Sequence, residues 1–356
     1  MNINDVFNLF NETQPKKYDM KNLWNEEKDF RQIIFAEWGS NKIVIKIACN
    51  GFSTSERFTG WLSTMEEYRK SGYYCPHVVK NRNGRFCETV SYQGKDCLVW
   101  AEEYSRYKTA DKFDPSFIRN GKTYRYHDDA VKSIGIIASK HLSFTNWPST
   151  WCILRTFCPT DPCDETMGYA VEFKNYIEQE LPAYMGRFSR IWKSYQENKE
   201  KLQPIYRQLP TSVFQGDLNP NNILLDESGK FVGLIDFNLS GRETVINYLF
   251  MEAMWDFKED ADCLIKDHSR FYDRALDHKY DDSLIRNLRI VSQIYTFSGR
   301  EKEAAIFLYR YIRPFNGPVV DELKRVRNDN SEVNMLLDWI ENQIIRDDLN
   351  FESILS

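Results

Sequence analysis

The sequence predicts an α+β fold in which a small antiparallel β-rich N-terminal lobe precedes a larger, mainly helical C-terminal lobe. Two observations support this prediction. The first hundred residues contain paired apolar runs joined by tight-turn sequences, whereas long amphipathic segments dominate after residue 104. Because the pattern changes from paired apolar runs to amphipathic segments near residues 102–106, we expect the two lobes to cover residues 1–103 and 104–356.

The N-terminal lobe is expected to have the order β-β-α-β-β. Runs 30–38 and 42–48 flank the turn sequence Gly-Ser-Asn and predict one hairpin, and runs 89–93 and 96–101 around Gly94 predict another. The helix between them should start at Ser53 or Ser55, which are both suitable N-caps, and end near Arg69. Its apolar residues lie on one face.

The C-terminal lobe begins with a helix predicted over residues 128–142. A long amphipathic stretch at 172–209 contains Pro182, which marks a helix start or a kink. Helical patterns return after Val245 and break near residues 313–318. Between these helical regions, residues 213–241 read as a β-hairpin, with the turn Asp226–Gly229 and a positive φ expected at its glycine.

This hairpin carries a pattern of polar residues that is typical of kinase-type phosphoryl-transfer sites. Asp217 lies in the loop before the hairpin, Asn222 at its entry and Asp236 at its exit. Asp217 is the candidate to accept or orient the proton of an acceptor hydroxyl. Asn222 and Asp236 supply hard oxygen ligands for Mg²⁺. The alternative is a purely structural role, in which each aspartate only caps a turn or ends a strand.

A cation is also needed to bind the outer phosphates. Lys46 is the best candidate, because a lysine within the apolar strand sequence KIVIKIA is costly to bury without an anion. Glu56, in the first turn of the following helix, could hold that lysine, and Glu66 and Glu67 on the same helix compete with it. A lysine that simply faces solvent is the alternative.

Together, QGDLNPNNILLD at 215–226 and GLIDF at 233–237 resemble the signature of the aminoglycoside phosphotransferase family, the small-molecule branch of the protein-kinase-like fold. The sequence GIIASKH at 135–141 is similar to a helix of that family. The resemblance implies an ATP site between the lobes, with adenine bonded to the backbone around Glu102, from Ala101 to Glu103. It also implies Asp217 as the catalytic aspartate, and Asn222 and Asp236 as magnesium ligands.

Two departures from the family pattern concern the site. Gln215 stands where the family usually has histidine, and glutamine keeps both a donor and an acceptor. The phosphate-covering loop is expected at residues 25–29, which contain no glycine. Backbone amides in that loop are therefore less able to approach phosphate closely.

Bulk properties exclude several other classes. A net charge of −5 is not that of a nucleic-acid-binding protein, and the sequence has neither a membrane-spanning run nor a secretory signal. The eight cysteines form no metal-binding pattern and suggest reduced thiols in the cytoplasm. We expect an ATP- and Mg²⁺-dependent kinase that phosphorylates a hydroxyl of an amino sugar, amino alcohol or sugar-like acceptor, cationic compounds included. The alternative is a catalytically impaired nucleotide-binding or scaffold protein.

Overall fold

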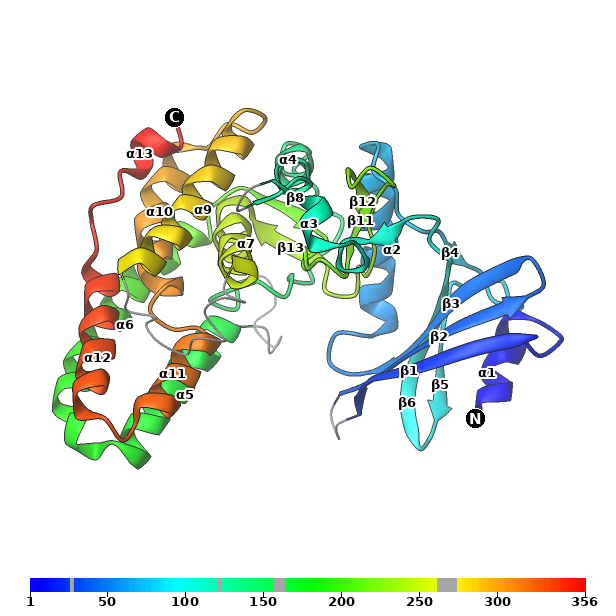
Figure 1. The fold of residues 1–356 in the computed structure, drawn as a ribbon, viewed down its shortest axis with the longest axis horizontal. Coiled ribbons are helices and arrows are strands. Elements are labelled where there is room, and N and C mark those ends of the chain that lie inside the picture. Colours follow the sequence, from blue (N-terminus) through cyan, green and yellow to red (C-terminus); the bar gives the residue numbers. More distant parts are fainter. Residues whose placement is uncertain (26–28, 121–122, 157–163, 261–273) are drawn as a thin grey trace. The chain divides into compact units, whose positions relative to one another are not determined.

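The computed structural model describes residues 1–25, 29–120, 123–156, 164–260 and 274–356 (Figure 1). The chain forms two compact units. The first, here called the N-terminal unit, contains residues 1–119 and 217–241, and the second, the C-terminal unit, contains residues 120–216 and 242–356. The lobes expected at 1–103 and 104–356 stay a prediction.

The N-terminal unit is built on one antiparallel sheet (Figure 1). Its strand order is β1-β2-β3-β6-β4, and β5 also pairs with β6. The strands are β1 (Lys17–Asn25), β2 (Phe30–Trp38), β3 (Asn41–Cys49), β4 (Val78–Val79), β5 (Cys87–Tyr92) and β6 (Lys95–Glu103). The two predicted hairpins are confirmed as β2–β3 and β5–β6.

Turn residues explain why these hairpins close where they do. Gly39 has a φ of 67°, and Gln93 and Gly94 have φ values of 51° and 79°. Such left-handed conformations match the twist of the flanking strands. One face of the sheet, with Ile34, Ile45 and their neighbours, packs into an apolar core with helix α1 (Ile3–Phe10), which our sequence analysis did not identify.

Helix α2 (Ser55–Lys70) is the predicted helix of this unit. Its N-cap is Thr54, whose hydroxyl accepts a hydrogen bond from the Arg57 backbone amide, so the expected caps Ser53 and Ser55 were wrong by one position. Shorter elements of the N-terminal unit are β7 (Lys108–Thr109), a 3₁₀ turn (Ala110–Lys112), α3 (Pro115–Ile118), β11 (Ile223–Leu225) and β12 (Phe231–Leu234). A two-stranded ribbon, β8 (Arg119–Asn120) with β9 (Thr123–Tyr124), begins at its last residue.

The C-terminal unit is mainly helical, as predicted. Pro182 begins a 3₁₀ turn (Pro182–Tyr184) that divides the long amphipathic stretch. The helices are α4 (His127–Ala138), α5 (Glu165–Glu180), α6 (Met185–Tyr206), α7 (Val245–Asp260), α9 (Arg274–Ser292), α10 (Gly299–Ile312), α11 (Gly317–Val326), α12 (Asn330–Ile345) and α13 (Phe351–Ile354). Strands β10 (Thr211–Phe214) and β13 (Gly241–Thr244) pair with each other. Helix α6 packs against α10 and α12.

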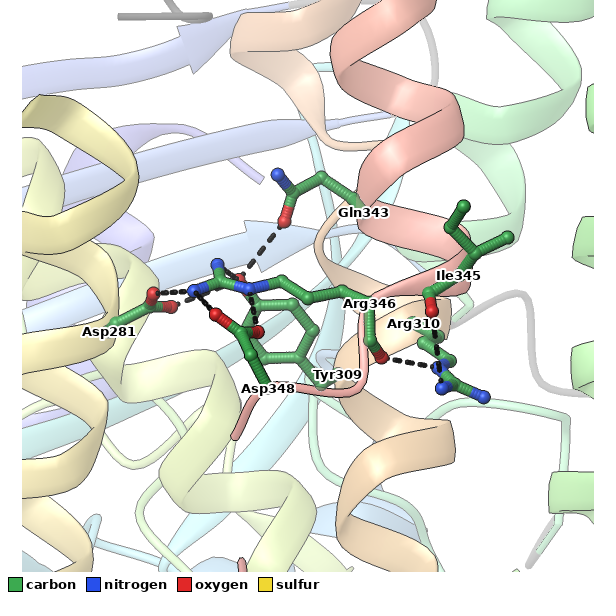
Figure 2. A network of polar contacts seen from close by, with 7 residues as sticks. All are labelled: Asp281, Tyr309, Arg310, Gln343, Ile345, Arg346 and Asp348. Atoms are coloured by element: carbon green, nitrogen blue, oxygen red, sulfur yellow. Dashed lines mark hydrogen bonds and ion pairs between the residues drawn. The ribbon is translucent and has the colours of Figure 1, made fainter. Parts of the chain in front are cut away.

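A buried ion pair attaches the C-terminal segment to this helical unit (Figure 2). Arg346, directly after α12, places Nη2 2.7 Å from Oδ2 of Asp281 on α9. Its Nη1 donates to the Tyr309 hydroxyl, whose single proton has two acceptors within reach, Asp281 Oδ1 at 2.9 Å and Gln343 Oε1 at 3.1 Å. Because Asp281 is buried, this network satisfies a carboxylate that would otherwise lack compensation.

The predicted fold class is confirmed, with an antiparallel N-terminal sheet and a mainly helical C-terminal region. Within the described ranges, no helix has the length and apolar character needed to cross a membrane.

Candidate active site

The 213–241 hairpin forms as predicted, because its turn is held by Asp226. The Asp226 Oδ1 atom accepts hydrogen bonds from the backbone amides of Ser228 and Lys230, and Gly229 has a φ of 80°. Strands β11 and β12 pair antiparallel, and the Ile235 amide donates to the Asn222 carbonyl at 2.9 Å. The entry and the exit of the hairpin are therefore neighbours.

Asp217 is held by two asparagine side chains. Asn222 Nδ2 donates to Asp217 Oδ2 at 2.8 Å, and Asn219 Nδ2 donates to Oδ1. Burial, followed by the negative charge of Asp236, raises the pKa of Asp217 to about 6. A carboxylate with a raised pKa, fixed by two donors, suits a group that accepts or orients a proton near neutral pH. Our sequence analysis did not single out Asn219, although it lies within the recognised motif.

Lys46 lies between two carboxylates. Its Nζ atom is 3.1 Å from Oε1 of Glu102 and 3.1 Å from Oδ1 of Asp236. Burial disfavours the ammonium charge, but the charges of Asp236 and Glu102 outweigh burial and raise the pKa of Lys46 above its ordinary value. The lysine is therefore a fixed cation beside Asp236, and the solvent-facing alternative is wrong, because Lys46 is 8% exposed.

The helix acids expected to hold Lys46 lie elsewhere. Glu56 is exposed at the start of α2, where the Thr54 side chain is among the groups that hydrogen-bond to it. Glu66 and Glu67 form ion pairs with Arg69 and Lys70 on their own helix. The expected pairing of Lys46 with an acid of this helix was therefore wrong. Glu102 takes that place.

Strand register explains why Glu102 is the partner. Lys46 lies directly opposite Trp100 on β6, and Glu102 is two residues further along the same face. The Trp100 indole also donates to Glu102 at 3.0 Å. Helix α2 presents Phe58 and Trp61 to Trp100, so its inner face is aromatic rather than acidic. The Glu102 side chain therefore binds the lysine, while the expected contact of adenine with the backbone around Glu102 stays a prediction.

A close backbone contact positions Asp236. The Tyr74 amide donates to the Val232 carbonyl at 2.8 Å, and the Leu234 amide donates to the Tyr74 carbonyl at 3.0 Å. A Cβ atom on Gly233 would lie 1.8 Å from that carbonyl oxygen, so only glycine fits between them. Two residues later, Asp236 has a φ of 60°, an uncommon conformation for a residue with a side chain.

The donor set fits a magnesium ion that is completed by phosphate oxygens. Asn222 uses its Nδ2 on Asp217, so its carboxamide oxygen is the atom left for a cation. Among the described residues, no group of three or more His, Cys, Asp or Glu could hold a metal. Mg²⁺ is commonly bound by one or two protein oxygens together with substrate phosphates, which is the site that Asn222 and Asp236 would make.

The loop preceding Asp217 is anchored in the C-terminal unit. Gln215 is fully buried there, as expected of a scaffold residue. The Tyr248 ring stacks on Phe214 with centroids 4.4 Å apart, and its hydroxyl accepts a weak hydrogen bond of 3.4 Å from the Gly216 amide. Gly216 itself has a φ of 92°.

The chain is similar to known phosphotransferases in part of its sequence and in its fold. A model of the phosphotransferase enzyme family matches residues 166–273. Among solved structures, the chain resembles an amicoumacin kinase in complex with AMP-PNP, Ca²⁺ and Ami, with a TM-score of 0.56 and 12% identity over 99% of this chain and 96% of that one. No curated protein matches the sequence.

Two further structures are similar at lower scores. One is a microcompartment-associated aminopropanol kinase, with a TM-score of 0.47 and 12% identity over 96% of this chain and 94% of that one. The other is a spectinomycin phosphotransferase in complex with ADP and spectinomycin, with a TM-score of 0.47 and 10% identity over 99% of this chain and 95% of that one.

The fold is similar to that of the amicoumacin kinase. The family match, which covers residues 166–273, and the fold both indicate a small-molecule phosphotransferase.

Proposed function

We propose that this protein transfers the γ-phosphoryl group of ATP, with Mg²⁺, to a hydroxyl of an amino sugar, an amino alcohol or a sugar-like acceptor. The observation that carries the proposal is the arrangement within the N-terminal unit of Lys46, Asp236, Asn222 and Asp217. A cation, two oxygen ligands and a carboxylate with a raised pKa are the parts that phosphoryl transfer requires.

Each side chain has a separate task in this proposal. Asp217 accepts or orients the proton of the acceptor hydroxyl, while Asn222 and Asp236 would hold Mg²⁺. The ion neutralises charge on the phosphates when bound. Lys46 binds phosphate oxygens as a fixed cation, because Glu102 holds it in place. Catalysis then rests mainly on position and charge.

The first acceptors to test follow from the names of similar structures. Amicoumacin kinase, aminopropanol kinase and spectinomycin phosphotransferase are each named for an acceptor, so their acceptors form the first panel to test. Choline, homoserine and simple sugars extend that panel. ADP release should rise with one of these compounds in the presence of Mg²⁺, and GTP should be compared with ATP as donor.

The variant Asp217→Asn tests the assigned chemistry. It keeps the size of the side chain and removes the charge, so kcat should fall by roughly 10²- to 10⁴-fold while ATP affinity stays nearly unchanged. Glu227→Gln, in the exposed turn of the same hairpin, is the matched control and should leave both unchanged. If no acceptor stimulates turnover although Mg-ATP binds, the impaired-kinase alternative holds. An equal loss of kcat and affinity in Asp217→Asn would contradict the role of Asp217.

A further inference from the structure

Arg31 lies on the same face of the sheet as Lys46. In the β2–β3 register, Arg31 is opposite Ala48, and Ile33 is opposite Lys46. Residues directly opposite each other on antiparallel strands point to one face, and so do residues two apart on one strand. Arg31 therefore lies about 7 Å further along the sheet than Lys46. Residues 26–28 of the phosphate-covering loop expected at 25–29 lie outside the described residues.

The guanidinium group of Arg31 is held in a fixed direction. Its Nε atom is 2.9 Å from Oδ1 of Asp29, and its Nη2 atom is 2.7 Å from Oδ2. Asn50 Nδ2 donates to the same Asp29 at 3.1 Å. The third nitrogen, Nη1, makes no hydrogen bond with the residues that the structure describes. The Arg31 side chain is 30% exposed, so Nη1 can meet a ligand.

Arg31 adds a second cation to the face of the sheet that carries Lys46. Lys46 forms ion pairs with Glu102 and Asp236, and Arg31 forms one with Asp29, so each cation has a fixed position. The register between β2 and β3 places both side chains on the same face.

We propose that Arg31 binds the γ-phosphoryl oxygens of the nucleotide donor and stabilises their charge during transfer, in the place of a glycine-rich loop. This inference rests on the proposed function. The transferring group carries its charge on three oxygens, and arginine presents several donors in one plane, which suits such a group. Asp29 acts as a positioning residue, because it orients the guanidinium without touching the nucleotide.

Equilibrium binding of two nucleotides tests this contact without knowledge of the acceptor. AMP-PNP and ADP, each with Mg²⁺, are titrated into the full-length wild type and into Arg31→Gln. A contact limited to the γ-phosphate predicts that Arg31→Gln weakens AMP-PNP binding on the order of tenfold to a hundredfold and ADP binding less than twofold. Arg82→Gln is the matched control, since Arg82 forms an ion pair with Glu12 in the same unit, and should change neither.

Two further variants test the purely structural alternative, in which the ion pair between Arg31 and Asp29 only stabilises the start of β2. Arg31→Lys keeps the charge and should lose less AMP-PNP affinity than Arg31→Gln. Asp29→Asn should weaken AMP-PNP binding modestly and spare ADP. Unchanged AMP-PNP binding in the folded Arg31 variants, or equal losses for both nucleotides, overturns the inference alone. Failure of the wild type to bind either nucleotide overturns the proposed function as well.

Discussion

Lys46 and Glu102 face each other from neighbouring strands, with 3.1 Å between Nζ and Oε1 and both side chains largely removed from solvent. The acid that holds the lysine thus comes from the sheet, whereas the aromatic face of α2 packs beside it. The counter-charge is part of the same rigid element as the lysine. Its position does not depend on where the helix lies.

Removal of Glu102 should therefore cost far more than removal of Glu56. Glu102→Gln leaves a buried lysine short of one partner, so we expect the free energy of unfolding to fall by about 3 to 5 kcal/mol. Glu56→Gln, at an exposed position, should leave it nearly unchanged. Urea unfolding followed by circular dichroism measures both. Similar values for the two variants would argue against Glu102 as the partner of Lys46.

A methyl group at position 233 should disrupt the hairpin. In Gly233→Ala the new Cβ would overlap the Tyr74 carbonyl, which is backbone and cannot rotate away. We expect a loss of about 1 to 3 kcal/mol or more, together with weaker Mg-ATP binding, because Asp236 follows two residues later. Gly168→Ala is the control. Its Cβ would meet nothing within 4 Å in α5, and it should stabilise the protein by up to about 1 kcal/mol. A thermal melt separates the two outcomes.

Glu243 should make stability depend on pH. This carboxyl is fully buried and accepts hydrogen bonds from Tyr206, Ser149 and the Thr244 amide. Burial raises its pKa from 4.5 to about 7. The folded state therefore binds the proton more tightly than the unfolded state does. The resulting stability is fully present below about pH 4.5 and is lost as the pH rises through about 7, by about 3 kcal/mol in total.

Glu243→Gln removes this titration and keeps an acceptor for Tyr206. As the pH rises from 5 to 8, the wild type should lose stability relative to Glu243→Gln. The difference in unfolding free energy between the two proteins should therefore change in favour of the variant. Urea titrations at the two pH values measure it, because other titrating groups cancel in the difference. A constant difference would show that Glu243 has an ordinary pKa in the folded protein.

The two acidic partners of Arg346 should differ in how much they contribute to the free energy of unfolding. Asp281 is 6% exposed in its side chain, and Asp348 is 65% exposed. Asp281→Asn leaves the arginine with an exposed partner and should lower the unfolding free energy by about 3 kcal/mol. Asp348→Asn should lower it by about 0.5 kcal/mol or less. Chemical unfolding of both variants checks this, and comparable losses would mean that burial does not decide the strength of these ion pairs.

Much of the fold followed from local signals. The turns at Gly39, Gly94 and Gly229 identified three hairpins, because the geometry of a tight turn is set by a few residues. Helix α1 and strand β1 were missed. Strand β1 carries exposed apolar side chains such as Tyr18 and Met20, so its pattern lacks the clean alternation of a half-buried strand.

The candidate site also had a part that local signals predicted and a part that they did not. The proximity of Asn222 and Asp236 followed from hairpin geometry alone, whereas the partner of Lys46 depends on the register between β3 and β6. Register is a tertiary property that the spacing of residues in one strand does not reveal. Leu98, Trp100 and Glu102 alternate along β6 and lie on the same face as Lys46. This alternation could have identified Glu102 as the partner of Lys46, but only once β6 is known to pair with β3.

The contact between Gly233 and the Tyr74 carbonyl has a consequence for protein engineering. A hairpin that carried its own metal ligands and turn could be moved between related scaffolds as a cassette. Here the cassette is incomplete, because the strand before Asp236 is bonded on its outer side to backbone some 160 residues earlier in the chain. A functional graft would have to carry residues 73–75 with it, or find a host whose backbone already occupies that place.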